Sequence, residues 1–192
     1  MLSVPWWLPA LVIGAARLLW PRHSWVAVLA YHLLCLTGLR GPFRWGEIGR
    51  AWIPLLAAFA LLPLILLIPP LPFFPRDQVA DLLSHWPGGL ATWAIYSFIF
   101  NVAIEEAFWR GTLLREKPWP ACVHGAAFGT HHFIAAVLQF GWTWALPSFL
   151  LPAAVGAFWA ECTRRSGGLG IALLTHLWAD AALVLLVAGQ LR

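Results

Sequence analysis

The carboxy-terminal part of the chain contains the stretch GLGIALLTHLWADAALVLLVAGQ at residues 168–190. It is longer than the about 20 mostly apolar residues that a helix needs to cross the hydrocarbon core of a membrane. The ionisable side chains within it are His176 and Asp180. The stretch therefore predicts a membrane-spanning helix that carries two polar groups inside the bilayer.

The composition of the whole chain agrees with this prediction. Its 192 residues are 61% hydrophobic and 10% charged, whereas soluble domains have about 45–50% apolar and about 25% charged residues. A soluble domain this short cannot bury so much apolar surface, because small domains expose a large share of what they contain. The composition excludes a soluble enzyme, a nucleic-acid binder and a disordered chain. We expect an integral membrane protein whose surroundings are the lipid bilayer, with no nucleic-acid partner.

Seven apolar runs are long enough, or nearly so, to be membrane spans. No internal repeat and no long linker separates them. The sequence therefore predicts an all-α, polytopic transmembrane helical bundle of about seven spans. The runs cover about residues 4–20, 24–39, 51–72, 89–113, 119–138, 142–162 and 168–190.

Basic residues between the runs predict how the chain lies in the membrane. Arg40, Arg44 and Arg50 follow the second run, and Arg115 and Lys117 follow the fourth. Cytoplasmic loops carry an excess of lysine and arginine, so we expect these loops and the amino-terminus in the cytoplasm. Lys117 is the only lysine among 12 basic residues. This bias favours a GC-rich, bacterial genome and hence a multi-pass protein of the bacterial inner (plasma) membrane.

The fourth run ends in a polar cluster that does not suit a lipid-facing helix. It contains Glu105, Glu106 and Arg110. Glu106 and Arg110 are spaced i,i+4, so they can pair along one face of a helix. Glu105 points about 100° away from that face and is left free to accept a proton. The alternative is a pair of interfacial charges that extend to the lipid headgroups.

Two further runs place polar side chains inside the membrane. His132 lies one helical turn after Phe128, with His131 beside it, and His176 lies one turn before Asp180. Ionisable groups within a membrane helix are costly and mark functional sites by default. Counted at about 1.5 Å per residue, these groups and Glu105 lie in the cytoplasmic half of their helices. We therefore expect one composite site that opens toward the cytoplasmic half of the bundle.

The order of these motifs resembles the CPBP family, the CAAX-protease and bacteriocin-processing intramembrane endopeptidases, also called the Abi family. The resemblance covers about residues 89–190. It implies that residues 76–192 form a catalytic helical core, and that residues 1–75 add accessory transmembrane helices. The motifs are Glu-Glu-x-x-x-Arg at Glu105, Glu106 and Arg110, Phe-x-x-x-His at Phe128 and His132, and His-x-x-x-Asp at His176 and Asp180.

The resemblance implies an endopeptidase that cleaves a membrane-associated protein or peptide, such as a leader or a carboxy-terminal sorting or anchor segment. In this interpretation Glu105 is the general base on a water that His132 helps to hold. His176 and the residue at position 180 stabilise the oxyanion. The remaining motif residues brace the helices or hold the substrate; they are Glu106, Arg110 and Phe128.

One position departs from the pattern of the proteolytic members that are best understood, which have asparagine where this chain has Asp180. An ionised carboxylate would repel an oxyanion, so we expect Asp180 to orient His176 or to help bind a metal. The motifs also leave open which glutamate is the base, because Glu105 and Glu106 are adjacent.

Several alternatives remain at this point. A zinc ion held by Glu105, His132 and His176 would have an open position for water, but the chain has no His-Glu-x-x-His motif and we favour hydrolysis without a metal. A non-proteolytic immunity or scaffold protein would retain the fold. A small transporter could use the same groups as a proton relay, although internal repeats would favour that function and none is present. No pattern in the sequence indicates an oligomeric state.

Overall fold

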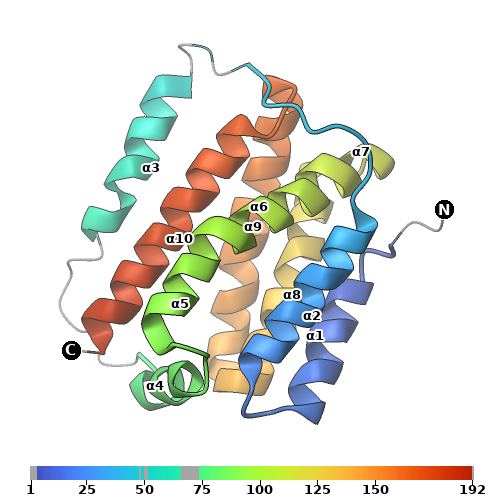
Figure 1. The fold of residues 1–192 in the computed structure, drawn as a ribbon. Helices are drawn as coiled ribbons and strands as arrows, with labels where there is room; N and C mark the ends of the chain where they lie inside the picture. The colour runs from blue at the N-terminus through green and yellow to red at the C-terminus, as the bar shows by residue number, and fades with distance from the viewer. Residues whose placement is uncertain (1–3, 48, 50–51, 66–73, 192) are drawn as a thin grey trace.

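The computed structural model describes residues 4–47, 49, 52–65 and 74–191. Every regular element in this part of the chain is a helix, which confirms the all-α prediction. Figure 1 shows long helices in the middle of the molecule and shorter ones on either side.

Three long helices form the centre of the bundle. They are α8 (Ala121–Phe140), α9 (Trp142–Ser166) and α10 (Gly170–Gln190), and each is long and apolar enough to cross a membrane. Helices α8 and α9 pack closely because glycines of α8 face α9. A Cβ on Gly125 would lie 2.1 Å from the carbonyl oxygen of Ala153. Small residues at such contacts let membrane helices approach.

A helical run from Gly89 to Glu116 slants across this centre (Figure 1). It consists of α5 (Gly89–Tyr96), η2 (Ser97–Asn101), α6 (Val102–Glu105), η3 (Glu106–Leu113) and α7 (Leu114–Glu116). The segments η2 and η3 are π-helical. Such segments are rare and occur frequently at functional sites. The change from α-helical to π-helical geometry therefore falls at Glu105, the last residue of α6, and Glu106, the first residue of η3.

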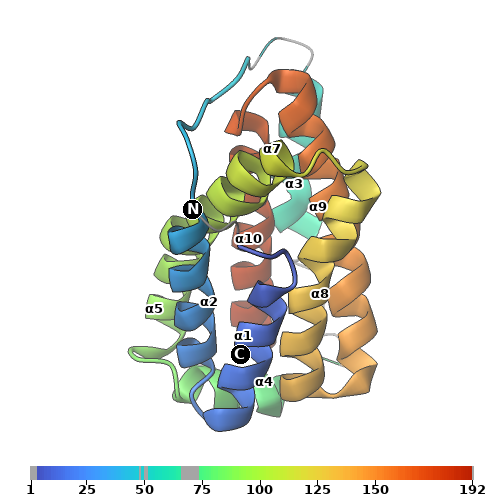
Figure 2. The same ribbon diagram turned by 90° about the vertical axis from the view of Figure 1, so that its right-hand side faces the viewer.

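The amino-terminal helices lie on both sides of the core. Helices α1 (Leu8–Leu19) and α2 (Ser24–Gly38) form a hairpin, and α1 also packs against α8. Helix α3 (Ile53–Ile65) packs against α10. Figures 1 and 2 show α3 on the opposite side of the bundle from the α1–α2 hairpin. Helix α4 (Arg76–Ser84) is short and meets the helical run after it at 87°.

The predicted count of seven spans is not confirmed. Within the described residues, three helices are long and apolar enough to cross a membrane, or four if α4 and the run after it form one bent span. The 12 residues of α1 extend only about 18 Å, less than the about 30 Å of a typical hydrocarbon core. The predicted third run, residues 51–72, lies partly outside the described residues.

An extended segment, residues 39–47, follows α2 and crosses the end of the core where α9 meets α10 (Figure 1); we call it the strap. Its backbone contacts the turn between α9 and α10: the amides of Leu169 and Gly170 donate to the carbonyls of Arg44 and Trp45, both at 2.8 Å. Arg115 Nη1 donates to the carbonyl of Pro42 at 3.1 Å. The loops rich in arginine thus meet at one end of the bundle. The location of these loops on the cytoplasmic side of the membrane stays a prediction. The division of the chain into accessory helices, residues 1–75, and a catalytic core, residues 76–192, also stays a prediction.

Candidate active site

Glu105 and Glu106 are both buried in the centre of the bundle, where α6 ends and η3 begins. Their exposed fractions are 2% and 0%. The two carboxylates diverge because consecutive residues of a helix point about 100° apart. Each therefore meets a different set of partners, and the site has two parts.

The first part surrounds Glu106. Its Oε1 atom accepts hydrogen bonds from Arg110 Nη1 at 2.9 Å and from His176 Nδ1 at 2.8 Å. The Arg110 guanidinium lies 4.3 Å from the ring centre of Phe128 and 4.9 Å from that of Trp159. Contacts of a guanidinium with an aromatic face are favourable when both are desolvated. The charge of Glu106 is thus balanced inside the protein, and Phe128 packs on the group that balances it.

The second part surrounds Glu105. Its Oε1 atom accepts a hydrogen bond from the Tyr31 hydroxyl at 2.9 Å, and that hydroxyl accepts one from Trp109 Nε1 at 2.8 Å. His131 Nε2 lies 3.4 Å from the same carboxylate oxygen. The other oxygen, Oε2, is buried without a hydrogen-bond partner among the described residues. It faces His176 Nε2 at 3.8 Å.

The two adjacent histidines of α8 differ in their surroundings. The His131 ring stacks between Trp109, at a ring-centre distance of 5.5 Å, and Tyr31, at 4.8 Å. Neither of its nitrogens has a hydrogen-bond partner in the described part of the chain. His132 Nδ1 donates to the carbonyl of Phe128 at 3.2 Å, which leaves its Nε2 as the acceptor atom. Sequence periodicity favoured His132, whereas the structure brings His131 against Glu105 as well.

His176 and Asp180 lie on α10 and border both parts of the site. The His176 ring stacks on Trp159 at a ring-centre distance of 4.1 Å, and its Nε2 lies 3.6 Å from Asp180 Oδ1. The other oxygen of Asp180 accepts a hydrogen bond from Asn101 Nδ2 at 3.1 Å. The groups from η2, α6 and α10 therefore meet around one point in the bundle.

Comparison with known proteins identifies the family. The family model for the type II CAAX prenyl endopeptidase Rce1-like proteins matches residues 87–182, half of the chain. The chain belongs to this family. The match covers the catalytic residues expected from the sequence on α6, α8 and α10. Searches of the curated proteins and of the solved structures found no match.

The Rce1-like family is a protease family, and membership supports a peptidase activity for this chain. Together with the long apolar helices, it supports an integral membrane protein. The matched residues begin after α4, yet α2 contributes Tyr31 directly to the Glu105 side of the site. Helix α2, which precedes the matched region, thus completes the surroundings of Glu105 in this family member.

The structure also contains a set of groups that suits a divalent metal ion. One oxygen of Glu105 and one nitrogen each of His131 and His132 lie within 4.8 Å of one another. Two imidazoles and a carboxylate are a common ligand set for zinc in hydrolases. The set predicted from sequence had His176 in place of His131. The grouping differs because His131 Nε2 lies 3.4 Å from Glu105, whereas Nδ1 of His176 is bonded to Glu106.

Four residues of the site were missed by sequence reasoning: Tyr31, Asn101, Trp109 and Trp159. Some signals were present. Asn101 lies one helical turn before Glu105 and Trp109 lies inside the Glu-Glu-x-x-x-Arg motif. Tyr31 is one of two tyrosines, and its hydroxyl in an apolar run needs a partner. That partner is distant in sequence, so local spacing does not identify it.

Proposed function

We propose that this Rce1-like family member is an intramembrane endopeptidase that hydrolyses a peptide bond in a membrane-associated protein or peptide, with Glu105 as the general base. The observation that carries the proposal is the state of the Glu105 carboxylate. One oxygen is held by the Tyr31 hydroxyl at 2.9 Å. The other is buried, has no hydrogen-bond partner among the described residues, and faces His176. A carboxylate oriented in this way is suited to take a proton from a water. Glu106 Oε2 is also buried without a hydrogen-bond partner there, but Glu106 is already ion-paired with Arg110 through its other oxygen.

In the proposed reaction, a water donates a proton to Glu105 Oε2 as its oxygen attacks the carbonyl carbon of the scissile bond. The imidazoles of His131 and His132 lie beside the carboxylate and hold the water. When the tetrahedral intermediate collapses, the carbon–nitrogen bond breaks. Protonated Glu105 then returns its proton to the leaving amine, so the enzyme is regenerated.

We assign oxyanion stabilisation to His176. Its Nδ1–H donates to Glu106 at 2.8 Å, so donation from Nε2 to an oxyanion requires the imidazolium form. Fixed donors aimed at developing charge are among the largest contributions to catalysis. Asp180 acts as a positioning residue, because one of its oxygens holds Asn101 and the other faces His176. Glu106 and Arg110 brace His176.

The proposed substrate is a leader peptide or a carboxy-terminal sorting or anchor segment. The site lies among apolar helices, which favours a substrate that is itself associated with the bilayer. In this proposal the protein resides in the bacterial inner membrane with the strap and its arginines on the cytoplasmic side. The site opens toward that half of the membrane.

A metal-dependent form of the same reaction is the second candidate, because Glu105, His131 and His132 are grouped closely enough to hold an ion. We favour the metal-free reaction, since Glu105 with its imidazoles suffices to activate water. Elemental analysis of the purified protein, with activity measured after treatment with a chelator, separates the two. Stoichiometric zinc together with activity that chelation abolishes and zinc restores would establish the metal-dependent form.

Terminal-peptide proteomics on membranes of the native host tests the activity without a prior choice of substrate. It compares the wild type with Glu105→Gln and with Glu161→Gln, a carboxylate that pairs with Arg165 near the end of α9. We expect one uncleaved precursor to accumulate with Glu105→Gln and none with Glu161→Gln. If neither Glu105→Gln nor Glu106→Gln changes any cleavage, at equal protein level and under conditions where the host uses the protein, an immunity or scaffold function is favoured.

A further inference from the structure

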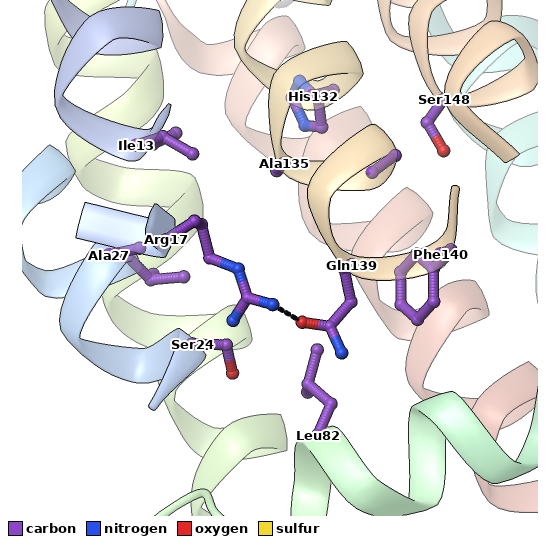
Figure 3. Close-up of a pocket in the computed structure, with 12 residues that line it drawn as sticks. Ile13, Arg17, Ser24, Ala27, Leu82, His132, Ala135, Gln139, Phe140 and Ser148 are labelled. Carbon is purple, nitrogen blue, oxygen red and sulfur yellow. Dashed lines mark hydrogen bonds between the residues drawn. The ribbon is translucent and has the colours of Figure 1, made fainter. Parts of the chain in front are cut away.

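A second polar location lies inside the bundle, in a cavity of about 240 Å³. The cavity is bounded by α1, α2 and α8, with Leu82 of α4 and Ser148 of α9 at its margins (Figure 3). Most of its lining is apolar. Its wall also includes the side chains of Arg17, Ser24 and Gln139, and His132 of the candidate active site.

Arg17 is buried in this wall, and no carboxylate of the described residues forms an ion pair with it. Its exposed fraction is 7%. Its Nη2 atom donates to Gln139 Oε1 (Figure 3), while Nε and Nη1 have no hydrogen-bond partner among the described residues. The nearby carboxyl end of α1 supplies only a partial negative charge. The Ser24 hydroxyl, on the same cavity, is likewise buried without a partner in the described part of the chain.

A charged guanidinium such as that of Arg17 is costly to bury without a partner. Removing a charge from water is unfavourable unless the charge is paired and hydrogen-bonded, so an arginine in this setting is suited to receive an anion. A single guanidinium balances a single negative charge, and its N–H groups match the two oxygens of a carboxylate. The apolar lining favours a ligand whose remaining part is apolar.

We propose that this cavity binds a carboxylate carried on a short apolar chain, with Arg17 as its charge partner and the Ser24 hydroxyl and Gln139 amide as further donors. The carboxyl end of an apolar peptide and a fatty acid share this chemistry. Gln139 and His132 lie seven positions apart on α8, which corresponds to about 10 Å along the helix. A bound chain of that length therefore extends from Arg17 to the side chain next to Glu105.

Binding to the purified protein in a maltoside detergent tests the site. The probes are octanoate and N-acetylated dileucine with a free carboxyl group, each compared with its uncharged amide by calorimetry. We expect the carboxylates to bind and the amides to bind about tenfold more weakly or worse, since hydrogen bonds between charged groups are the stronger ones. The carboxylate that binds more tightly shows whether the cavity takes the carboxyl end of a peptide or a fatty acid. Equal binding of acid and amide would overturn the proposal.

Variants separate ligand binding from folding. We expect Arg17→Gln to lose about tenfold or more in carboxylate affinity and Arg17→Lys to keep part of it. Arg22→Gln, at an exposed arginine after the same helix, should bind as the wild type does. Without ligand, Arg17→Gln should melt at or above the wild-type temperature, because it removes an unpaired buried charge.

A lower melting temperature with unchanged carboxylate affinity would instead make Arg17 a structural partner of Gln139 and contradict the proposal. If Arg17→Gln does not fold, the Ser24→Ala variant and the comparison of acid with amide on the wild type decide whether the cavity binds carboxylates. We expect Ser24→Ala to weaken the acid and leave the amide unchanged; equal weakening of both would count against the site. These measurements do not depend on proteolysis, so the site and the proposed function can fail separately.

Discussion

Glu105 and Glu106 are neighbours in the chain and equally buried, yet their surroundings differ. Glu106 has a guanidinium and an imidazole on one oxygen, at 2.9 and 2.8 Å. Glu105 has a neutral hydroxyl on the corresponding oxygen. The second oxygen of each residue is buried without a hydrogen-bond partner among the described residues, so the difference lies in the guanidinium. The comparison shows how one residue type serves two purposes: paired with a guanidinium it organises the helices, and held by a hydroxyl instead it is available for chemistry.

The comparison is tested most directly by exchanging each glutamate for glutamine. We expect Glu105→Gln to lower the cleavage rate by about 10²–10⁴-fold, the contribution of a general base, with little change in thermal stability. Glu106→Gln should lower stability and retain part of the activity. Rates on the identified precursor and melting curves in detergent measure both. The reverse pattern would make Glu106 the base.

The second prediction compares a buried pair with an exposed one. Arg110→Ala leaves Glu106 buried without its guanidinium, with the His176 imidazole as the remaining hydrogen-bond donor, and we expect it to lower the free energy of unfolding by about 3–5 kcal/mol. Arg165→Ala breaks the pair with Glu161, of which the arginine side chain is 70% exposed, and should cost about 0–1 kcal/mol. Unfolding by denaturant in detergent measures the free energy of unfolding of both variants. Similar losses would show that the pair of Glu106 and Arg110 is not desolvated.

The third prediction concerns the hydroxyl that holds Glu105. Tyr31→Phe removes the hydrogen bond to Glu105 and leaves Trp109 Nε1 without its acceptor, so we expect the rate to fall by about tenfold, as for the loss of one good hydrogen bond. Tyr96→Phe is the matched control, because the Tyr96 hydroxyl bonds to His32 instead. If both variants lower the rate equally, Tyr31 does not act through Glu105.

The smallest effect is expected at Asp180. Asp180→Asn keeps an acceptor for Asn101 and removes a negative charge 3.6 Å from His176 Nε2. An amide also offers a donor to an oxyanion. We therefore expect the cleavage rate to stay within about threefold of the wild type, since one hydrogen bond is exchanged for another. A loss of a hundredfold in kcat would instead assign the carboxylate itself a role in the reaction.

The sequence predicted best those features that depend on neighbouring residues. The pair of Glu106 and Arg110 follows from i,i+4 spacing, and the structure contains it. Apolar composition predicted the three long helices, whereas it did not show how short α1 is, because the apolar run begins at Val4 and the helix only at Leu8. The amphipathic helix α4 was not foreseen either, since it lies between the predicted runs.

The site features that depend on packing could not be predicted. Tyr31 reaches Glu105 across 74 positions of the chain, and no local pattern encodes such a contact. The choice between His131 and His132 depends on the rotation of α8, which is decided by the stacking of His131 between Tyr31 and Trp109. The roles proposed for these residues stay predictions until the variants are measured.

The strap has a consequence for how the chain tolerates change over evolutionary time. At its contacts with the α9–α10 turn the strap supplies the carbonyls of Arg44 and Trp45 and the amide of Glu47. Every amino acid supplies a carbonyl, and every one except proline supplies an amide N–H. Most strap positions are therefore free to drift in identity. Gly41 and Gly46 are exceptions because their φ angles are +66° and +74°, and so is Gly168, where a Cβ would lie 2.2 Å from the Gly46 nitrogen. Saturation mutagenesis would thus find a permissive segment with two intolerant glycines and a third in the turn that the strap contacts.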